Sequence, residues 1–118
     1  MQNLRRLLVY PVALELAKSV YDLTAGFPKP EQFGLTSQMQ RASVSVGANI
    51  SEGCGRRSDA ALRNFLYYSM GSASELDFQL DLSQLLHYGN PQLQRATVNN
   101  ATKMRKMLSR LIGSLDPV

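Results

Sequence analysis

Polar residues on two predicted helices form the first candidate for a chemical site. On a helical wheel of 100° per residue, those of segment 35–55 and of the residue that follows it fall within about 60° of arc, beside an apolar stripe. These residues are Gln38, Arg41, Ser45, Glu52 and Arg56, and a later helix adds Glu75. They could bind a ligand or exchange protons, but acid–base catalysis needs a titrating pair around a concave site. We favour a paired polar network, here called the polar seam, that fixes helix register or a subunit contact.

Metal and thiol chemistry have little support in the sequence. The chain holds a single histidine, His87, and a single cysteine, Cys54. Because a protein zinc site takes three or four ligands, we predict no metal site and no cofactor. No histidine lies near Cys54 in the sequence to act as its base, so we expect an inert thiol. The residue types therefore predict a protein that is not an enzyme.

A basic stripe on segment 90–118 gives the best signal for nucleic-acid binding. This segment carries five Lys or Arg residues and one Asp, a net charge of +4. Four of the basic side chains fall within about 80° of arc, away from the apolar side. They are Arg95, Lys103, Lys106 and Arg110. Such a stripe is typical of phosphate contacts, although an ordinary solvated surface is an open alternative. No aromatic residue lies among them, so we expect backbone rather than base recognition.

The spacing of apolar residues predicts four helices and a single domain over residues 1–118. We expect a first helix over 8–25, with Pro11 in its first turn. A second helix is expected over 35–55, with Gly47 indicating close backbone approach by a neighbour. The third should run from Ser58 to about Tyr88 and close at Gly89, and the fourth should begin at Asn90-Pro91. Short connections between long helices favour an all-α, antiparallel up-down-up-down four-helix bundle.

The third predicted helix is apolar on two sides, which predicts self-association. Leu62, Leu66, Ala73, Leu76 and Leu80 form the stripe that a bundle core needs. A second cluster lies on the opposite side. Its members are Tyr67, Phe78, Leu82 and Leu85. Isolated exposed aromatics are common, but four residues at helical spacing favour an interface of a homo-oligomer.

Composition places the chain among water-soluble cytoplasmic proteins. A length of 118 residues suits one domain with its own core. No apolar run approaches the roughly 20 residues of a membrane span, and no cleavage site follows the basic start, so neither a membrane partner nor a signal peptide is expected. A single cysteine also suits a reducing compartment.

Segments along the chain together resemble a known family. They are LAKSVYDLTAGFP, FGLTSQMQRASVSVGANISEGCGRRSD and NFLYYSMGSASELDFQL. The chain is similar, from about Leu8 to His87, to the bacterial four-helix-bundle proteins of the 23S rRNA intervening-sequence family. The resemblance implies a small, non-enzymatic bundle that assembles as a homopentamer. A related branch of retroelement accessory proteins works with a reverse transcriptase and nucleic acid, which implies RNA, DNA or such an enzyme as partners.

Residues and resemblance together predict a cytoplasmic homo-oligomer that acts by binding. The first hypothesis is contact with nucleic acid, or with a nucleic-acid enzyme, through the basic stripe. The alternative is a structural or protein-binding oligomer without a nucleic-acid role. A third hypothesis, an active site between subunits that uses Glu52, Arg56 and Glu75, has the least support.

Overall fold

The structure is a computed structural model that describes the backbone of residues 2–115 and the side chains of residues 8–115. Within this part of the chain there are four α-helices and one short 3-10 helix. They are α1 (Gln2–Thr24), η1 (Lys29–Glu31), α2 (Leu35–Cys54), α3 (Asp59–Leu85) and α4 (Pro91–Leu115). The connections are short, as predicted for helices that pack beside their neighbours in sequence.

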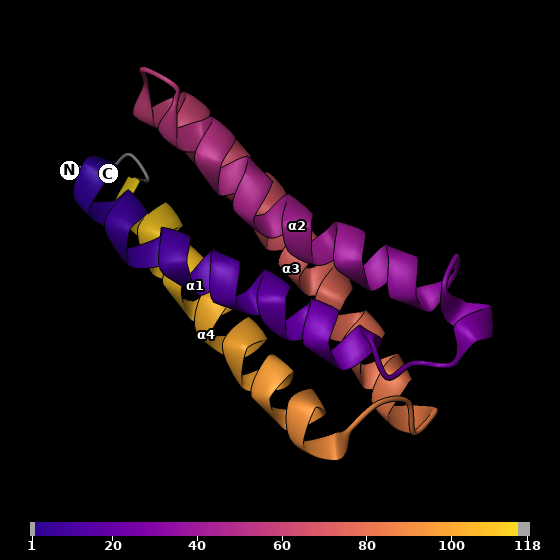
Figure 1. The fold of residues 1–118 in the computed structure, drawn as a ribbon. Helices are drawn as coiled ribbons and strands as arrows, with labels where there is room; N and C mark the ends of the chain where they lie inside the picture. Colours follow the sequence, from indigo (N-terminus) through magenta and orange to yellow (C-terminus); the bar gives the residue numbers. More distant parts are fainter. Residues whose placement is uncertain (1, 116–118) are drawn as a thin grey trace.

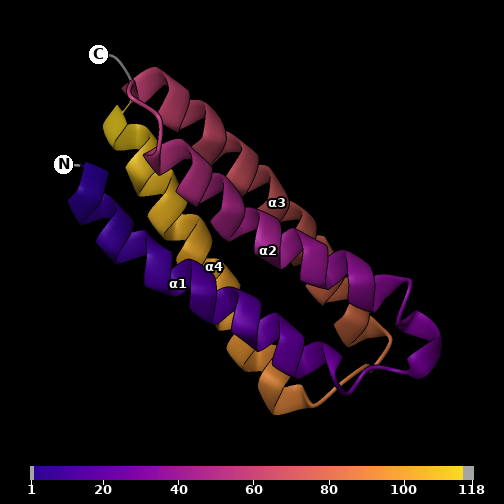
Figure 2. The ribbon, with the colours of Figure 1, turned by 45° about the horizontal axis from the view of Figure 1, so that its top comes forward.

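The helices lie side by side in alternating directions, so α1 begins and α4 ends at the same end of the molecule (Figures 1 and 2). Each helix packs against the next in sequence, and α4 returns to pack against α1. Among the described residues the backbones of α1 and α3 do not come close to each other, because these helices occupy diagonal corners. The predicted four-helix bundle is confirmed.

The core is formed by the apolar stripes that the spacing predicts. Every predicted stripe residue of α1, α2 and α3 is buried, including Leu16, Ile50 and Leu76 at full burial. In α4, Met104 and Leu108 are fully buried, but Leu93 is exposed and Met107 only half-buried. The apolar spacing of this segment also predicts Leu93 on the buried side, and that prediction was wrong because Gln94 and Thr97 take the inward positions in the first two turns of α4.

The buried Gln94 side chain of α4 is held by hydrogen bonds to α3. The Gln94 side-chain amide donates to the Leu80 carbonyl oxygen over 2.8 Å. The Ser83 hydroxyl of α3 donates to the side-chain oxygen of Gln94, Oε1, over 3.2 Å. Because buried polar atoms are costly without partners, this pairing allows a glutamine at a core position. Sequence patterning alone gives no signal for it.

Two helix ends differ from the prediction. Helix α1 begins at Gln2 rather than near residue 8, so Pro11 lies inside the helix rather than in its first turn. Proline is preferred in a first turn, but packing of the flanking stripe from Val9 to Ala13 can offset its cost inside a helix. Helix α3 ends at Leu85, three residues early, because His87 has a φ of 60° in the left-handed region.

Of two glycines of α2, it is Gly53, not Gly47, that lies in close contact with a neighbouring helix. A methyl group on Gly53 would lie 2.9 Å from Cβ of Phe65 and 3.0 Å from Cδ1 of Leu62. A methyl group on Gly47 would meet only Cβ of Ala13, at an ordinary contact distance of 3.5 Å. The inference drawn from Gly47 was therefore wrong within the chain, and Gly53 lets α2 and α3 pack together.

Candidate functional site

The basic stripe lies on the outer surface of α4. Lys103, Lys106 and Arg110 are exposed and surround one shallow hollow of about 510 Å³ together with Asn99 and Thr102. Arg95 is also exposed but lies about 12 Å further along the helix, eight residues at 1.5 Å each. The structure therefore brings three of the four predicted residues around one concave surface and leaves Arg95 apart.

The charge of this surface is not neutralised by the chain itself. The range 91–115 holds five basic residues and no Asp or Glu. Among the side chains of residues 8–115, none of the four stripe residues forms an ion pair. The fifth basic residue, Arg105, differs because its Nε lies 2.6 Å from Asp77 Oδ2 on α3. Arg105 thus holds two helices together while the stripe faces solvent.

The ion pair with Arg105 sits partly inside the protein. Burial raises the pKa of the Asp77 carboxyl, and the nearby charge of Asp81 raises it further. The guanidinium of Arg105 acts in the opposite direction and lowers the same pKa. The ion pair of Arg105 with Asp77 is therefore a structural contact between α4 and α3. Because each side chain is already paired, neither is open to a ligand as the residues of the basic stripe are.

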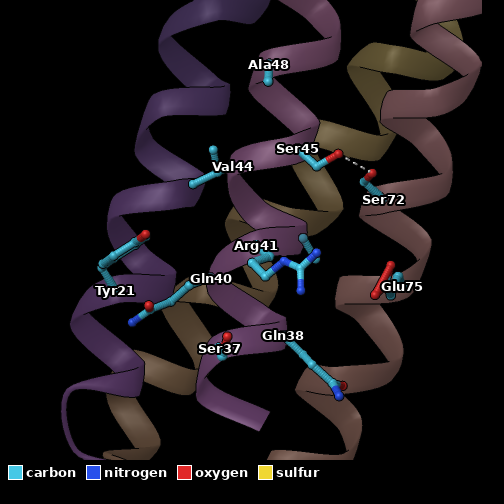
Figure 3. A pocket seen from close by; sticks show the side chains of 11 residues that line it. Tyr21, Ser37, Gln38, Gln40, Arg41, Val44, Ser45, Ala48, Ser72 and Glu75 are labelled. Atoms are coloured by element: carbon cyan, nitrogen blue, oxygen red, sulfur yellow. Dashed lines mark hydrogen bonds between the residues drawn. The ribbon is translucent and has the colours of Figure 1, made fainter. Parts of the chain in front are cut away.

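The polar seam divides into two places along α2. Gln38, Arg41, Ser45 and Glu75 line one groove, which has a volume of about 920 Å³ and opens to solvent (Figure 3). Glu52 and Arg56 lie nearer the α2–α3 turn, where their side chains pair at 2.5 Å. The Arg56 guanidinium also lies 4.9 Å from the centre of the Phe65 ring, in a cation–π contact. Glu52 and Arg56 therefore have partners of their own and do not line the groove.

The groove around Arg41 has polar walls and a floor of small residues. Ser45 and Ser72 join α2 to α3 through a hydrogen bond of 2.9 Å across this floor (Figure 3). Arg41 extends from α2 toward the side of α3 that carries Glu75 (Figure 3). Glu75 accepts a long hydrogen bond of 3.4 Å from the Gln79 side chain. The groove can offer hydrogen bonds and two opposite charges to whatever covers it.

His87 and Cys54 lie far apart in the fold. His87 is exposed beyond the end of α3, whereas Cys54 is half-buried at the end of α2 and packs against the core. Across the described residues there is no group of three His, Cys, Asp or Glu side chains placed to hold a metal ion. Nor is any helix in residues 2–115 long and apolar enough to cross a membrane.

The second apolar cluster of α3 lies mostly on the surface. Phe78 is 70% exposed, Leu85 is 76% exposed and Tyr67 is 52% exposed. Leu82 differs from these three because it is half-buried against the core. The structure therefore places three of the four predicted interface residues where another molecule can reach them.

Sequence reasoning missed an exposed apolar stripe on α1. Its large side chains are Tyr10, Leu14 and Tyr21, and Leu14 is 57% exposed. A neighbouring residue of α2, Val44, is also exposed. The signal was present in the sequence, since positions 10, 14, 17 and 21 repeat at helical spacing on the flank beside the buried stripe.

Fold and surface together define a small all-α bundle with a basic outer helix and exposed apolar residues on two other helices. The family model of the 23S rRNA-intervening sequence protein matches residues 5–110. This match spans most of the sequence, so the chain belongs to that family. A search of curated proteins finds no match.

A solved structure with the same fold comes from Bacteroides thetaiotaomicron. It is described as a protein of unknown function from the S23 ribosomal protein family. The two chains are 25% identical and superpose with a TM-score of 0.81. The similarity covers 92% of this chain and 98% of the other. The bundle is therefore shared over nearly the whole length of both proteins.

Proposed function

We propose that this protein is a non-enzymatic homo-oligomer, with five copies as the expected number, that binds the phosphate backbone of RNA or DNA through α4. The observation that carries the proposal is the group of Lys103, Lys106 and Arg110 around one hollow. All three are exposed, and none has a carboxylate partner among the described side chains. Cationic side chains without internal partners are free to bind phosphate oxygens.

The chemistry of the hollow favours phosphate rather than bases. Its other polar lining residues, Asn99 and Thr102, can add neutral hydrogen bonds to phosphate or sugar oxygens. The hollow has no aromatic side chain on which a base could stack. Recognition would therefore depend on charge and shape, with little dependence on sequence.

Self-association would strengthen such binding because every copy adds one basic stripe. Phe78 and Leu85 on α3 and Leu14 on α1 are large apolar side chains that the single chain leaves more than half exposed. Burial of such groups between copies stabilises an assembly. An oligomer that presents several stripes binds a polyanion more tightly than one stripe does, since later contacts become intramolecular.

The four lysines of the chain provide a matched experiment. Lys103 and Lys106 belong to the stripe, whereas Lys18 and Lys29 are exposed on α1 and η1. Lys103→Gln/Lys106→Gln and Lys18→Gln/Lys29→Gln both lower the net charge from +4 to +2. We expect the first pair to weaken binding of a labelled structured RNA or duplex DNA about tenfold or more, since two charged contacts are lost. Equal affinities of the two variants in fluorescence anisotropy would refute the role of α4.

A structural or protein-binding oligomer is the second candidate, and the groove around Arg41 favours it. Its opposite charges and small-residue floor suit a protein surface better than a polyanion, because Glu75 repels phosphate. A nucleic-acid enzyme such as a reverse transcriptase belongs to this candidate as a partner. Absence of RNA and DNA binding by an oligomer of verified mass would select it.

A further inference from the structure

Two exposed stripes on diagonal helices share one spacing. On α1 the stripe consists of Tyr10, Leu14, Ala17 and Tyr21, and on α3 it consists of Tyr67, Gly71, Ser74 and Phe78. Both stripes have an aromatic residue at each end, eleven positions apart. The two members between them follow the first aromatic residue by four and by seven positions. Such spacing keeps all members on one side of a helix.

The second members of the stripes are opposite in size. Leu14 projects from α1 with 57% of its surface exposed. Gly71 lies in the middle of α3, where a methyl group would meet no atom within 4 Å. A glycine destabilises a helix interior, and no contact within the described chain requires one here. Tyr67 and Phe78 therefore flank a notch on α3, and α1 carries a side chain of the size that fills it.

Contacts through α2 show that Leu14 and Gly71 lie at the same level along the bundle. Gly47 of α2 lies beside Ala13 of α1, the residue before Leu14. Val46 precedes Gly47 on α2, and its carbonyl oxygen accepts a hydrogen bond of 2.8 Å from the Ser69 hydroxyl of α3. Ser45 bonds to Ser72 in the same stretch. Residues 13–14 of α1 and 69–72 of α3 thus share one level, on opposite corners of the bundle.

We propose that a second copy of this chain docks its α3 stripe on the α1 stripe, with Leu14 of one copy filling the notch at Gly71 of the next. The proposal rests on the homo-oligomer proposed above and names its interface. At matching level, Tyr10 meets Tyr67 and Tyr21 meets Phe78. Large side chains are then opposed at both ends of the contact, around the central pair of Leu14 and Gly71.

This contact is heterologous, because each copy uses one surface to bind and a different one to be bound. Helices α1 and α3 run in the same direction (Figure 1). A rotation about an axis parallel to the helices therefore brings α3 of one copy against α1 of the next without a shift along the axis. A head-to-tail contact without such a shift closes into a ring instead of extending as a filament.

The test is a size exchange at the central pair, followed by light scattering. Gly71→Leu fills the notch, and we expect the oligomer mass to fall toward that of one chain. Leu14→Ala removes the projecting side chain, and we expect Leu14→Ala/Gly71→Leu to recover the mass by reversing the sizes. Gly113→Leu is the matched control, because Gly113 also lies inside a helix with no atom within 4 Å of an added methyl group.

Circular dichroism keeps the fold separate from the assembly. Gly71→Leu should retain a helical spectrum, since the single chain has space for the side chain. A Gly71→Leu protein with the wild-type oligomer mass would overturn the interface while leaving the homo-oligomer itself intact. A wild-type protein that is monomeric at all concentrations would instead overturn both proposals.

Discussion

The hydroxyl of Tyr88, beyond the end of α3, donates a hydrogen bond of 2.9 Å to the carboxylate of Glu31 in η1, 57 positions earlier in the sequence. The other oxygen of Glu31 accepts from the backbone N–H of Leu35 over 3.2 Å, so the same carboxylate caps the start of α2. The Tyr88 ring also packs on Phe27, with ring centres 5.4 Å apart. One acidic side chain thereby fastens the α1–α2 connection to the α3–α4 turn.

This contact predicts a loss of stability at alkaline pH. The hydrogen bond to Glu31, followed by burial, raises the pKa of Tyr88. A raised tyrosine pKa means that the folded protein favours the protonated hydroxyl. Its contribution is complete below the pKa of the unfolded chain, about 10, and is lost as pH rises through the higher folded value.

Thermal unfolding measured at a series of pH values below and above about 10 checks the prediction. The melting temperature of the wild type should fall more steeply above about pH 10 than that of Tyr88→Phe, which lacks the ionising hydroxyl. Tyr10→Phe provides a control, since this variant keeps Tyr88 and its contact with Glu31. Identical pH profiles for the wild type and Tyr88→Phe would show that the contact does not stabilise the fold.

Two glycines of α2 should respond to alanine with opposite signs. Gly53→Ala places a methyl group 2.9 Å from Phe65 Cβ, and we expect the free energy of unfolding to fall by about 1–3 kcal/mol through overpacking. Gly47→Ala meets Ala13 at 3.5 Å, and the helix should gain about 0.5–1 kcal/mol. Urea denaturation of both variants measures the two effects. A stabilised Gly53→Ala protein would contradict the close approach of α2 and α3.

The buried amide of Gln94 should matter far more than its exposed neighbour in sequence. Gln94→Ala removes the hydrogen bonds to Leu80 and Ser83, and we expect unfolding to become easier by about 1–3 kcal/mol. Gln92 is exposed on the same turn, and Gln92→Ala should change stability by no more than about 0.5 kcal/mol. Chemical denaturation of the pair gives the comparison. Equal effects would mean that the Gln94 network carries no stability.

The sequence predicts the bundle well where spacing alone decides the outcome. The stripes around Leu16, Ile50 and Leu76 are buried because a 3.6-residue period allows only one continuous face toward the core. Helix ends are harder to predict, since they depend on tertiary packing. Pro11 indicated a helix start, yet α1 continues through it, and the left-handed residue at His87 shortens α3.

The candidate sites show the same limit. The stripe of Lys103, Lys106 and Arg110 could be placed from spacing because all three lie on one helix. The groove could not, since it depends on which residues of α2 and α3 meet, whereas the pairing of Glu52 with Arg56 follows from their i,i+4 spacing on one helix. Gln94 was missed because a polar residue gives no apolar signal, although its hydrogen bonds place it in the core.

The salt dependence of nucleic-acid binding tests the central claim most directly. Anisotropy titrations of the wild-type oligomer with a structured RNA and a duplex DNA should be measured over a salt series, with the mass verified in each buffer. We expect a plot of the logarithm of the binding constant against the logarithm of the salt concentration to be linear. Three phosphate contacts per chain predict a slope of about −2.7 or steeper on duplex DNA. Absence of binding at low salt, or affinity that does not change with salt, would contradict phosphate recognition by α4.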